Sequence, residues 1–210
     1  MPQRMFVFVF SCVICIAASS SAQMNSRWQY GLKGGLSAST HDVSGDWPYK
    51  TDYRTGIDVG AFVSWRFAFS TALLMEAHYV QNGHDGIEGW DPATSEGPPA
   101  PSDFRIDYIT LPFLLRIDMP VGDLPTYLLA GPYVSFKIGQ NSDVKKYYED
   151  NLESFTLGGA VGFGHQWQVG ARMAVFGEAL YRHDLTKAFD LNGIKLNNRA
   201  FSVLLGVKID

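Results

Sequence analysis

The stretch Gly56–Trp65, GIDVGAFVSW, carries apolar side chains at its odd positions, with Asp58, Gly60 and Ser64 among the residues between them. A period of two places successive side chains on opposite faces of a β-strand, so this stretch predicts a strand with one apolar face. The end of the sequence, Phe201–Ile209 (FSVLLGVKI), repeats the alternation. The sequence therefore predicts an all-β fold.

The same alternation recurs along the chain. It predicts strands at about residues 27–39, 55–66, 70–82, 104–118, 124–138, 153–167, 171–183 and 199–209. Between them, tight connections (67–69, 119–123, 168–170) alternate with long ones (40–54, 83–103, 139–152, 184–198).

This sorting of the connections is typical of outer-membrane barrels, which have short periplasmic turns and longer external loops. A β-strand of about ten residues is long enough to cross a bilayer, and the chain has room for eight such strands. The prediction is an eight-stranded antiparallel up-and-down transmembrane β-barrel with four longer external loops.

The composition agrees with a single domain of strands and turns. Of the 210 residues, 46% are hydrophobic, 14% are aromatic and 18% are charged, and 21 are glycine. Such a mixture excludes collagen-like, coiled-coil and charge-rich disordered chains. The formal net charge of −4 leaves no basic excess to neutralise phosphates, so we expect no nucleic-acid partner.

The first 22 residues have the pattern of a secretory signal peptide. Arg4 precedes an uncharged apolar run, Met5–Ala18, and small residues lie before Gln23. The run is too short to cross the hydrocarbon layer as a helix, so residues 1–22 are predicted to be cleaved and residues 23–210 to form the barrel domain. Both cysteines lie in this segment, which leaves the exported chain without disulfide or thiol chemistry.

Charged residues recur on the second face of the strands. A Lys or Arg facing lipid at the bilayer midplane would cost about 2–4 kcal/mol, so these charges are expected to point into the lumen. The lumen of an eight-stranded barrel is just filled by side chains. Four charges near mid-strand are our candidates for a buried ion-pair network: Lys33, Glu76, Arg116 and Glu178.

Aromatic residues gather near the predicted strand ends, where a membrane barrel meets the lipid headgroups. The candidates for interface girdles are Trp28, Tyr30, Trp65, Tyr79, Trp167 and Tyr181.

Five longer motifs resemble the PorT-like outer-membrane β-barrel family of Gram-negative bacteria. They are YGLKGGLSAST (30–40), DYITLPFLLRI (107–117), LLAGPYVSFKIG (128–139), GGAVGFGHQW (158–167) and EALYRHDLTKAF (178–189). The resemblance covers essentially the whole exported chain. It implies an eight-stranded outer-membrane barrel, inserted by the barrel-assembly machinery, without catalytic residues. The founding member of that family is associated with protein secretion and surface export.

The expected function is that of a non-enzymatic integral outer-membrane protein. We expect a structural or interaction scaffold that contacts outer-membrane lipid and presents its external loops to a protein partner, without a cofactor or metal. Two alternatives are a porin-like channel for small solutes and a soluble secreted barrel that binds an apolar ligand. A third is a lipid-directed enzyme, for which His78 beside Glu76 is the nearest catalytic candidate.

Overall fold

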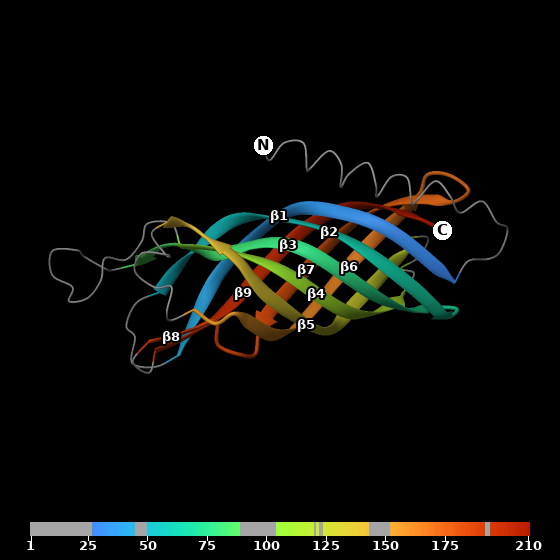
Figure 1. Cartoon of the computed structure of the whole chain (residues 1–210). Helices are drawn as coiled ribbons and strands as arrows, with labels where there is room; N and C mark the ends of the chain where they lie inside the picture. The colour runs from blue at the N-terminus through green and yellow to red at the C-terminus, as the bar shows by residue number, and fades with distance from the viewer. Residues whose placement is uncertain are drawn as a thin grey trace, which may run out of the picture.

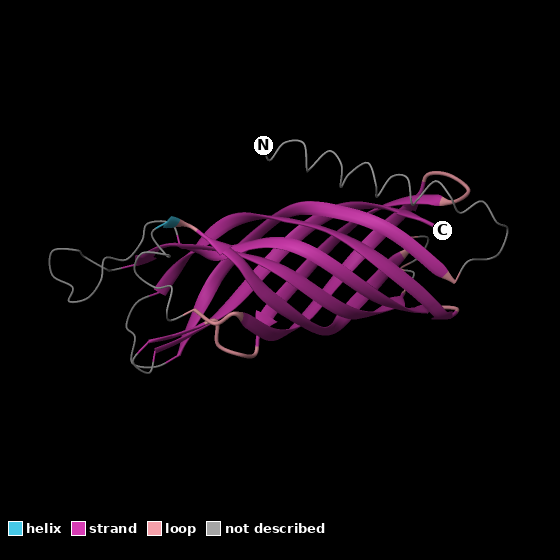
Figure 2. Cartoon of the chain, viewed as in Figure 1, coloured by secondary structure: helices cyan, strands magenta, loops and turns pink. Residues whose placement is uncertain are grey.

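The computed structural model describes residues 27–44, 50–88, 104–119, 121, 124–142, 152–191 and 194–210. This part of the chain is almost entirely β-strand (Figures 1 and 2). The strands are β1 (Trp28–Ser44), β2 (Lys50–Ala68), β3 (Thr71–Glu88), β4 (Phe104–Asp118), β5 (Thr126–Gln140), β6 (Phe155–Gln168), β7 (Met173–Asp184), β8 (Phe189–Leu191) and β9 (Ile194–Ile209). Within the described ranges, no helix has the length and apolar character needed to cross a membrane.

Eight of these strands form a closed barrel. Each of β1 to β7 pairs antiparallel with the next barrel strand, and β9 pairs both with β7 and with β1. The closing pair places Lys33 opposite Gly206 and Leu36 opposite Val203. The predicted eight-stranded antiparallel barrel is therefore confirmed. The short strand β8 pairs only with the first residues of β9 and adds a small hairpin that the sequence did not predict.

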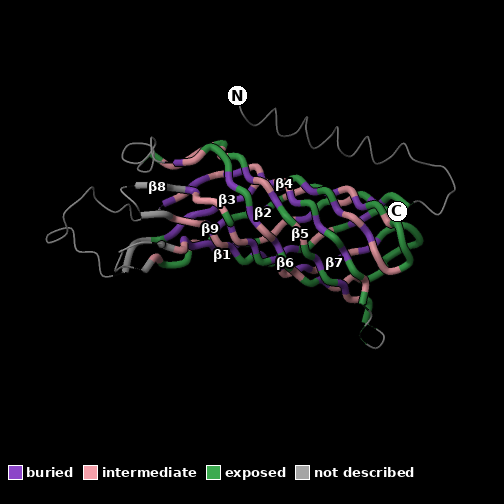
Figure 3. Tube along the Cα trace, turned by 90° about the horizontal axis from the view of Figure 1, so that it is seen from below, coloured by how far each residue is buried: buried purple, intermediate pink, exposed green. Residues whose placement is uncertain are grey.

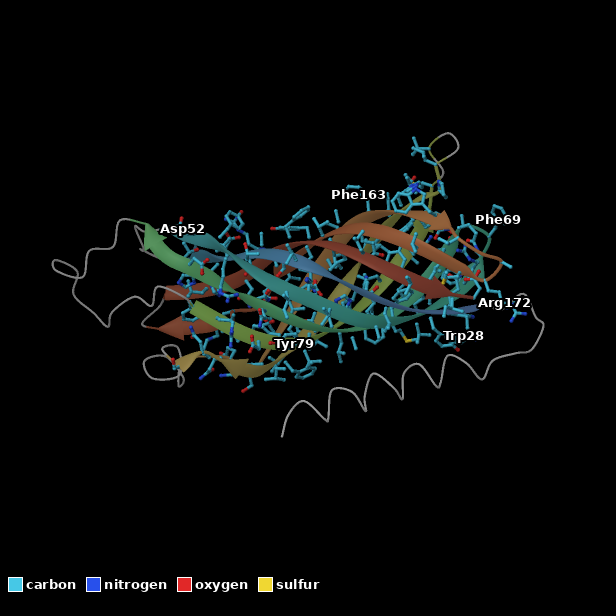
Figure 4. All side chains as sticks on the ribbon, turned by 90° about the horizontal axis from the view of Figure 1, so that it is seen from above. Trp28, Asp52, Phe69, Tyr79, Phe163 and Arg172 are labelled. Carbon is cyan, nitrogen blue, oxygen red and sulfur yellow. The ribbon has the colours of Figure 1, made fainter. Side chains whose placement is uncertain are left out.

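The connections are sorted to the two ends of the barrel. The short connections (69–70, 119–125 and 169–172) lie at one end, together with the start of β1 and the end of β9. Figure 4 shows this arrangement, with Phe69, Arg172 and Trp28 near one end and Asp52 near the other. We call the two ends the short-turn end and the long-loop end.

The strands extend further toward the long-loop end than predicted. β1 continues to Ser44 and β2 begins at Lys50, so the connection expected at 40–54 contains only residues 45–49. The connection expected at 184–198 contains β8. Toward the long-loop end the outward residues are no longer regularly apolar, so the sequence shows no alternation there. The strands nevertheless remain paired through their backbones.

The two faces of the wall differ in polarity. Along most of the length of the barrel strands, buried residues alternate with exposed or partly exposed ones (Figure 3). Leu205 and Leu36, which face outward, are 70% and 61% exposed, whereas the charged Asp58 and Lys33 are 0% and 4% exposed. This polarity is the reverse of what a soluble ligand-binding barrel needs, and it suits a barrel surrounded by lipid.

Two glycines of β6 make room for tyrosine rings that enter the lumen from β5. A Cβ atom at Gly164 would lie 2.3 Å from the ring of Tyr127, and one at Gly158 would lie 2.3 Å from the ring of Tyr133. Any larger residue would displace these rings. The glycine-rich motif of β6 therefore sets where the two tyrosine hydroxyls lie in the lumen.

The outward face yields a direct prediction. Replacing Leu205 by Arg places a charge on the outer face of β9, and we expect a loss of about 2–4 kcal/mol in the free energy of unfolding in lipid vesicles. Leu205→Met should change it little. Equal stability of Leu205→Arg and the native chain in urea titrations would mean that this face does not contact lipid.

Candidate functional site

The centre of the lumen holds a buried ion-pair cluster on three strands. Lys33 (β1) lies between two carboxylates: its Nζ is 2.8 Å from Glu76 Oε1 (β3) and 2.6 Å from Glu178 Oε2 (β7). The three side chains are almost completely buried. The structure thus brings together three of the four residues that the sequence suggested for an ion-pair network.

Three further charged residues extend this cluster. His78 Nε2 is 3.0 Å from Glu76 Oε2, and His78 Nδ1 is 2.6 Å from Asp58 Oδ1. Arg182 donates from Nη2 to the second oxygen of Asp58 and, at 2.8 Å, to Ser202 Oγ. We call the six residues Lys33, Asp58, Glu76, His78, Glu178 and Arg182 the lumen plug.

The lumen plug is balanced in charge. A neutral imidazole has one donor and one acceptor, but both ring nitrogens of His78 meet carboxylate oxygens. The arrangement is satisfied when both nitrogens carry a proton. His78, Lys33 and Arg182 then supply three positive charges against the three carboxylates. This balance is what a buried site requires, because an unpaired charge is costly in a medium of low dielectric constant.

Arg116 does not join the ion pairs of the lumen plug, contrary to the prediction. It donates from Nε to Asp118 Oδ1 at 2.7 Å and from Nη2 to Gln166 Oε1 at 2.7 Å. The register explains the difference: Arg116 lies opposite Ala72, four positions nearer the short-turn end than Glu76 on β3, or about 13 Å along the strand. Strand register could not be read from the sequence.

A tyrosine connects Arg116 to the lumen plug. The guanidinium of Arg116 lies 3.7 Å from the ring centroid of Tyr127, and the Tyr127 hydroxyl donates to Glu178 Oε1 at 2.9 Å. The predicted network therefore exists in a different form, with an aromatic ring between two of its charged members.

Sequence analysis missed Asp58, His78 and Arg182 as members of the network. All three occupy inward positions, so the period of two carried the necessary signal. Their pairing depends on register, which brings Asp58 opposite Val80 and His78 opposite Gly60. His78 was recognised beside Glu76 from the sequence, but only as a catalytic candidate.

Apolar layers close the lumen on both sides of the charges. One cluster contains Phe62, Leu74, Leu114, Leu129 and Phe176, and the Lys33 ammonium lies 5.8 Å from the ring centroid of Phe62. A second cluster, at the long-loop end, contains Phe104, Ile106, Tyr108 and Leu152, with Leu196 packed against it. Buried apolar clusters thus lie on both sides of the lumen plug, as expected for an eight-stranded barrel whose interior is filled by side chains.

Two buried histidines lie beside the second apolar cluster. His41 Nδ1 and His84 Nδ1 are 2.8 Å apart, and the ring of His84 stacks on Phe104 with centroids 4.7 Å apart. Both lie at the long-loop end of the barrel, where His41 is opposite Asn198 and the outer face carries the exposed pair Arg199–Asp42. A charged outer face does not suit the hydrocarbon layer, so the two histidines are outside the membrane-spanning part of the strands. Burial lowers the pKa of His41 to about 4, and burial together with His41 lowers the pKa of His84 to about 2.

The girdle candidates all lie on the outer face or at its edge. Trp28 and Trp65 stack at the short-turn end, with ring centroids 6.2 Å apart. Tyr30 and Trp167 are exposed near the same end, and Tyr181 is exposed nearer the long-loop end. Tyr79 is partly buried, and its hydroxyl accepts a hydrogen bond from Gln81 at 3.0 Å. Contact of these rings with lipid headgroups stays a prediction.

The hydrogen bonds of His78 do not suit a catalytic base. Both nitrogens of His78 are engaged by carboxylates, so neither is available to accept a proton from a nucleophile. In the part of the chain that the structure describes, no three His, Cys, Asp or Glu side chains are arranged to hold a metal ion.

Comparison with known proteins defines the class. Residues 18–190 match the model of a family described as "Outer membrane protein beta-barrel domain". The chain belongs to this family, and the protein is located in the outer membrane. The short-turn end then faces the periplasm and the long-loop end faces outward.

Two solved structures resemble this chain, and the first of them supports the fold. Neisserial surface protein A (NspA) matches with a TM-score of 0.51 and 15% identity over 88% of this chain and 97% of that one. The outer membrane protein OprG from Pseudomonas aeruginosa has a TM-score of 0.49 and 14% identity over 86% of this chain and 95% of that one. At this level of identity the likeness to NspA concerns the fold alone. No curated protein matches the sequence with significance.

Charge balance in the lumen plug can be tested with a double-mutant cycle. Lys33→Met leaves Glu76 and Glu178 without their shared cation, and we expect it to lower the free energy of unfolding by about 3–5 kcal/mol. Adding Glu178→Gln restores the balance and should recover part of this loss. The matched control is Arg199→Gln, which removes the exposed Arg199–Asp42 pair at a cost of less than about 1 kcal/mol. Additive effects of Lys33→Met and Glu178→Gln would contradict the account.

The histidine pair predicts acid sensitivity at the external end. The folded state holds these rings neutral, whereas the unfolded chain protonates them near pH 6.5, so stability falls as the pH drops from about 6.5 toward 4. At pH 5 we expect a loss of about 2 kcal/mol for each histidine. The variant His41→Asn/His84→Phe should lose most of this dependence in urea titrations, and the control His183→Gln should keep it. Unchanged acid sensitivity in the double variant would contradict the assignment.

Proposed function

We propose that the protein is a non-enzymatic scaffold of the outer membrane, which holds a closed barrel in the bilayer and presents its external loops to a partner. The observation that carries this proposal is the charge-balanced lumen plug between two apolar layers. A barrel built for passage needs a water-filled path. Each carboxylate of the lumen plug forms an ion pair with a positively charged side chain of another strand. These pairs suit an interior that stabilises the barrel.

The alternative is a small-solute channel. Passage would require the Lys33–Glu76 and Lys33–Glu178 pairs to separate together, and the apolar layer around Phe104 to move as well. Separation would leave buried charges without partners, which costs several kcal/mol for each ion. This cost favours the scaffold over the channel.

The lack of catalysis is part of the proposal. The nearest catalytic candidate, His78, has both nitrogens occupied by Asp58 and Glu76, which supports a structural role for that side chain. A lipid-directed enzyme would need a base with one nitrogen free to accept a proton.

We further infer, from the motifs that resemble the PorT-like family, a partner in protein secretion or surface export. Export with cleavage of residues 1–22 and insertion by the barrel-assembly machinery belong to the same proposal. The external loops are the natural contact region, because the outward wall is apolar and the lumen is filled.

Conductance measurements distinguish the scaffold from the small-solute channel. In planar bilayers we expect the native protein and Glu76→Gln to remain silent, because the apolar layers still block the lumen after that change. Discrete conductance steps that change in Glu76→Gln would instead establish a channel.

Partner binding tests the scaffold itself. Replacing residues 91–101 with a Gly-Ser linker of equal length should reduce partner recovery by cross-linking in intact cells. The heat-dependent gel shift that reports a folded barrel should remain. The same replacement should impair secretion if the partner belongs to an export system. Unchanged cross-linking after replacement of each external loop in turn would reject the scaffold.

A further inference from the structure

The connection between β4 and β5 forms a small hairpin that projects sideways from the barrel at the periplasmic end (Figure 4). Its two strands continue the antiparallel pairing past the wall: Met119 N donates to Thr126 O at 2.9 Å, Val121 N to Leu124 O at 3.0 Å, and Leu124 N to Val121 O at 3.1 Å. The base is tied to β6 by a hydrogen bond of 3.1 Å from Gln166 N to Pro125 O.

The described part of the hairpin backbone suits an environment with little water. Lipid cannot satisfy backbone donors, so they must be paired within the protein. The donors of Met119, Val121 and Leu124 are paired, and Thr126 N donates to Leu124 O at 2.9 Å. Pro120 and Pro125 have no N–H group to satisfy.

Three described side chains of the hairpin are apolar and exposed. Met119, Val121 and Leu124 are 45%, 62% and 56% exposed. A turn that lies in water is usually built from polar residues. Asp123 is the one charged residue in the sequence of this connection. Three exposed apolar side chains whose own backbone donors are paired therefore indicate that the described sides of the hairpin contact an apolar medium.

A groove lies between the hairpin and the outer face of the barrel. It has a volume of about 270 Å³ and is lined by Met119, Val121, Thr126, Tyr127, Leu128 and Phe163. Leu128 and Phe163 belong to the outward apolar face of β5 and β6, which contacts lipid. The groove is thus continuous with the lipid-facing surface.

We propose that this groove is a binding site for one acyl chain of a phospholipid from the periplasmic leaflet, held between the hairpin and the wall at Leu128 and Phe163. The site differs from general contact between the wall and lipid because the hairpin covers the chain from a second side. It does not depend on whether the lumen conducts or on which partner meets the external loops.

Native mass spectrometry tests this site. The full-length protein is purified in detergent, mixed with 1-palmitoyl-2-oleoyl-phosphatidylethanolamine and released from the micelle. We expect one phospholipid to remain on each native barrel. Val121→Trp fills the groove, and Val121→Ser/Leu124→Ser removes apolar contact, so each should lower the retained fraction by about tenfold.

The matched control is Val169→Ser, which removes an exposed apolar residue from the neighbouring β6–β7 turn and should leave retention unchanged. The heat-dependent gel shift checks that every variant is folded. Equal retention in the groove variants and the native protein, or no retained phospholipid on the native barrel, would overturn the proposal. A retained second copy of the chain in place of phospholipid would also overturn it, and would assign the groove to a protein interface.

Discussion

The structure depends on the need to bury charge without leaving it unpaired. Eight strands enclose a lumen too narrow for an open water channel, and the outer face is given to lipid. Charged side chains therefore need partners among the other side chains of the lumen. Lys33 between Glu76 and Glu178, and His78 between Glu76 and Asp58, satisfy this need within hydrogen-bond distance. Because the six residues of the lumen plug come from β1, β2, β3 and β7, their pairing links strands that are distant in sequence.

The rest of the interior supports this charge cluster. Gly164 and Gly158 leave space for the rings of Tyr127 and Tyr133, whose hydroxyls donate to Glu178 at 2.9 Å and to Asp184 at 2.5 Å. Apolar side chains lie around and beyond the charges and exclude water, which strengthens each ion pair. The same packing explains why we place the function in the external loops and the outer surface. The interior is used for stability, while the loops and the periplasmic hairpin are free to meet other molecules.

The sequence predicted the wall of the barrel better than its interior. The period of two, which recurs from Gly56–Trp65 to Phe201–Ile209, predicted the strands and their two faces, because lipid imposes the same alternation on every strand. The alternation of tight and long connections predicted the antiparallel barrel class. The strand ends beyond the apolar band were missed, since polar residues such as His41 give no alternation there. The lumen plug was predicted only in part, because ion pairs such as Asp58–Arg182 depend on strand register and barrel closure. Strand register also separates Arg116 from Glu76, and Arg116 instead pairs with Asp118 two residues further along its own strand.

The central claim is that β9 presents one face to lipid and the other to a filled lumen. Single cysteines at Val203 and Leu205 on the outer face, and at Ser202 and Leu204 on the inner face, can be tested in lipid vesicles, in a chain whose own two cysteines lie in the predicted signal peptide. We predict that the outer positions react with a lipid-soluble maleimide and not with a water-soluble thiosulfonate reagent, and that the inner positions react with neither. Reaction of Ser202→Cys and Leu204→Cys with the water-soluble reagent would contradict the account, because it would require an open, hydrated lumen.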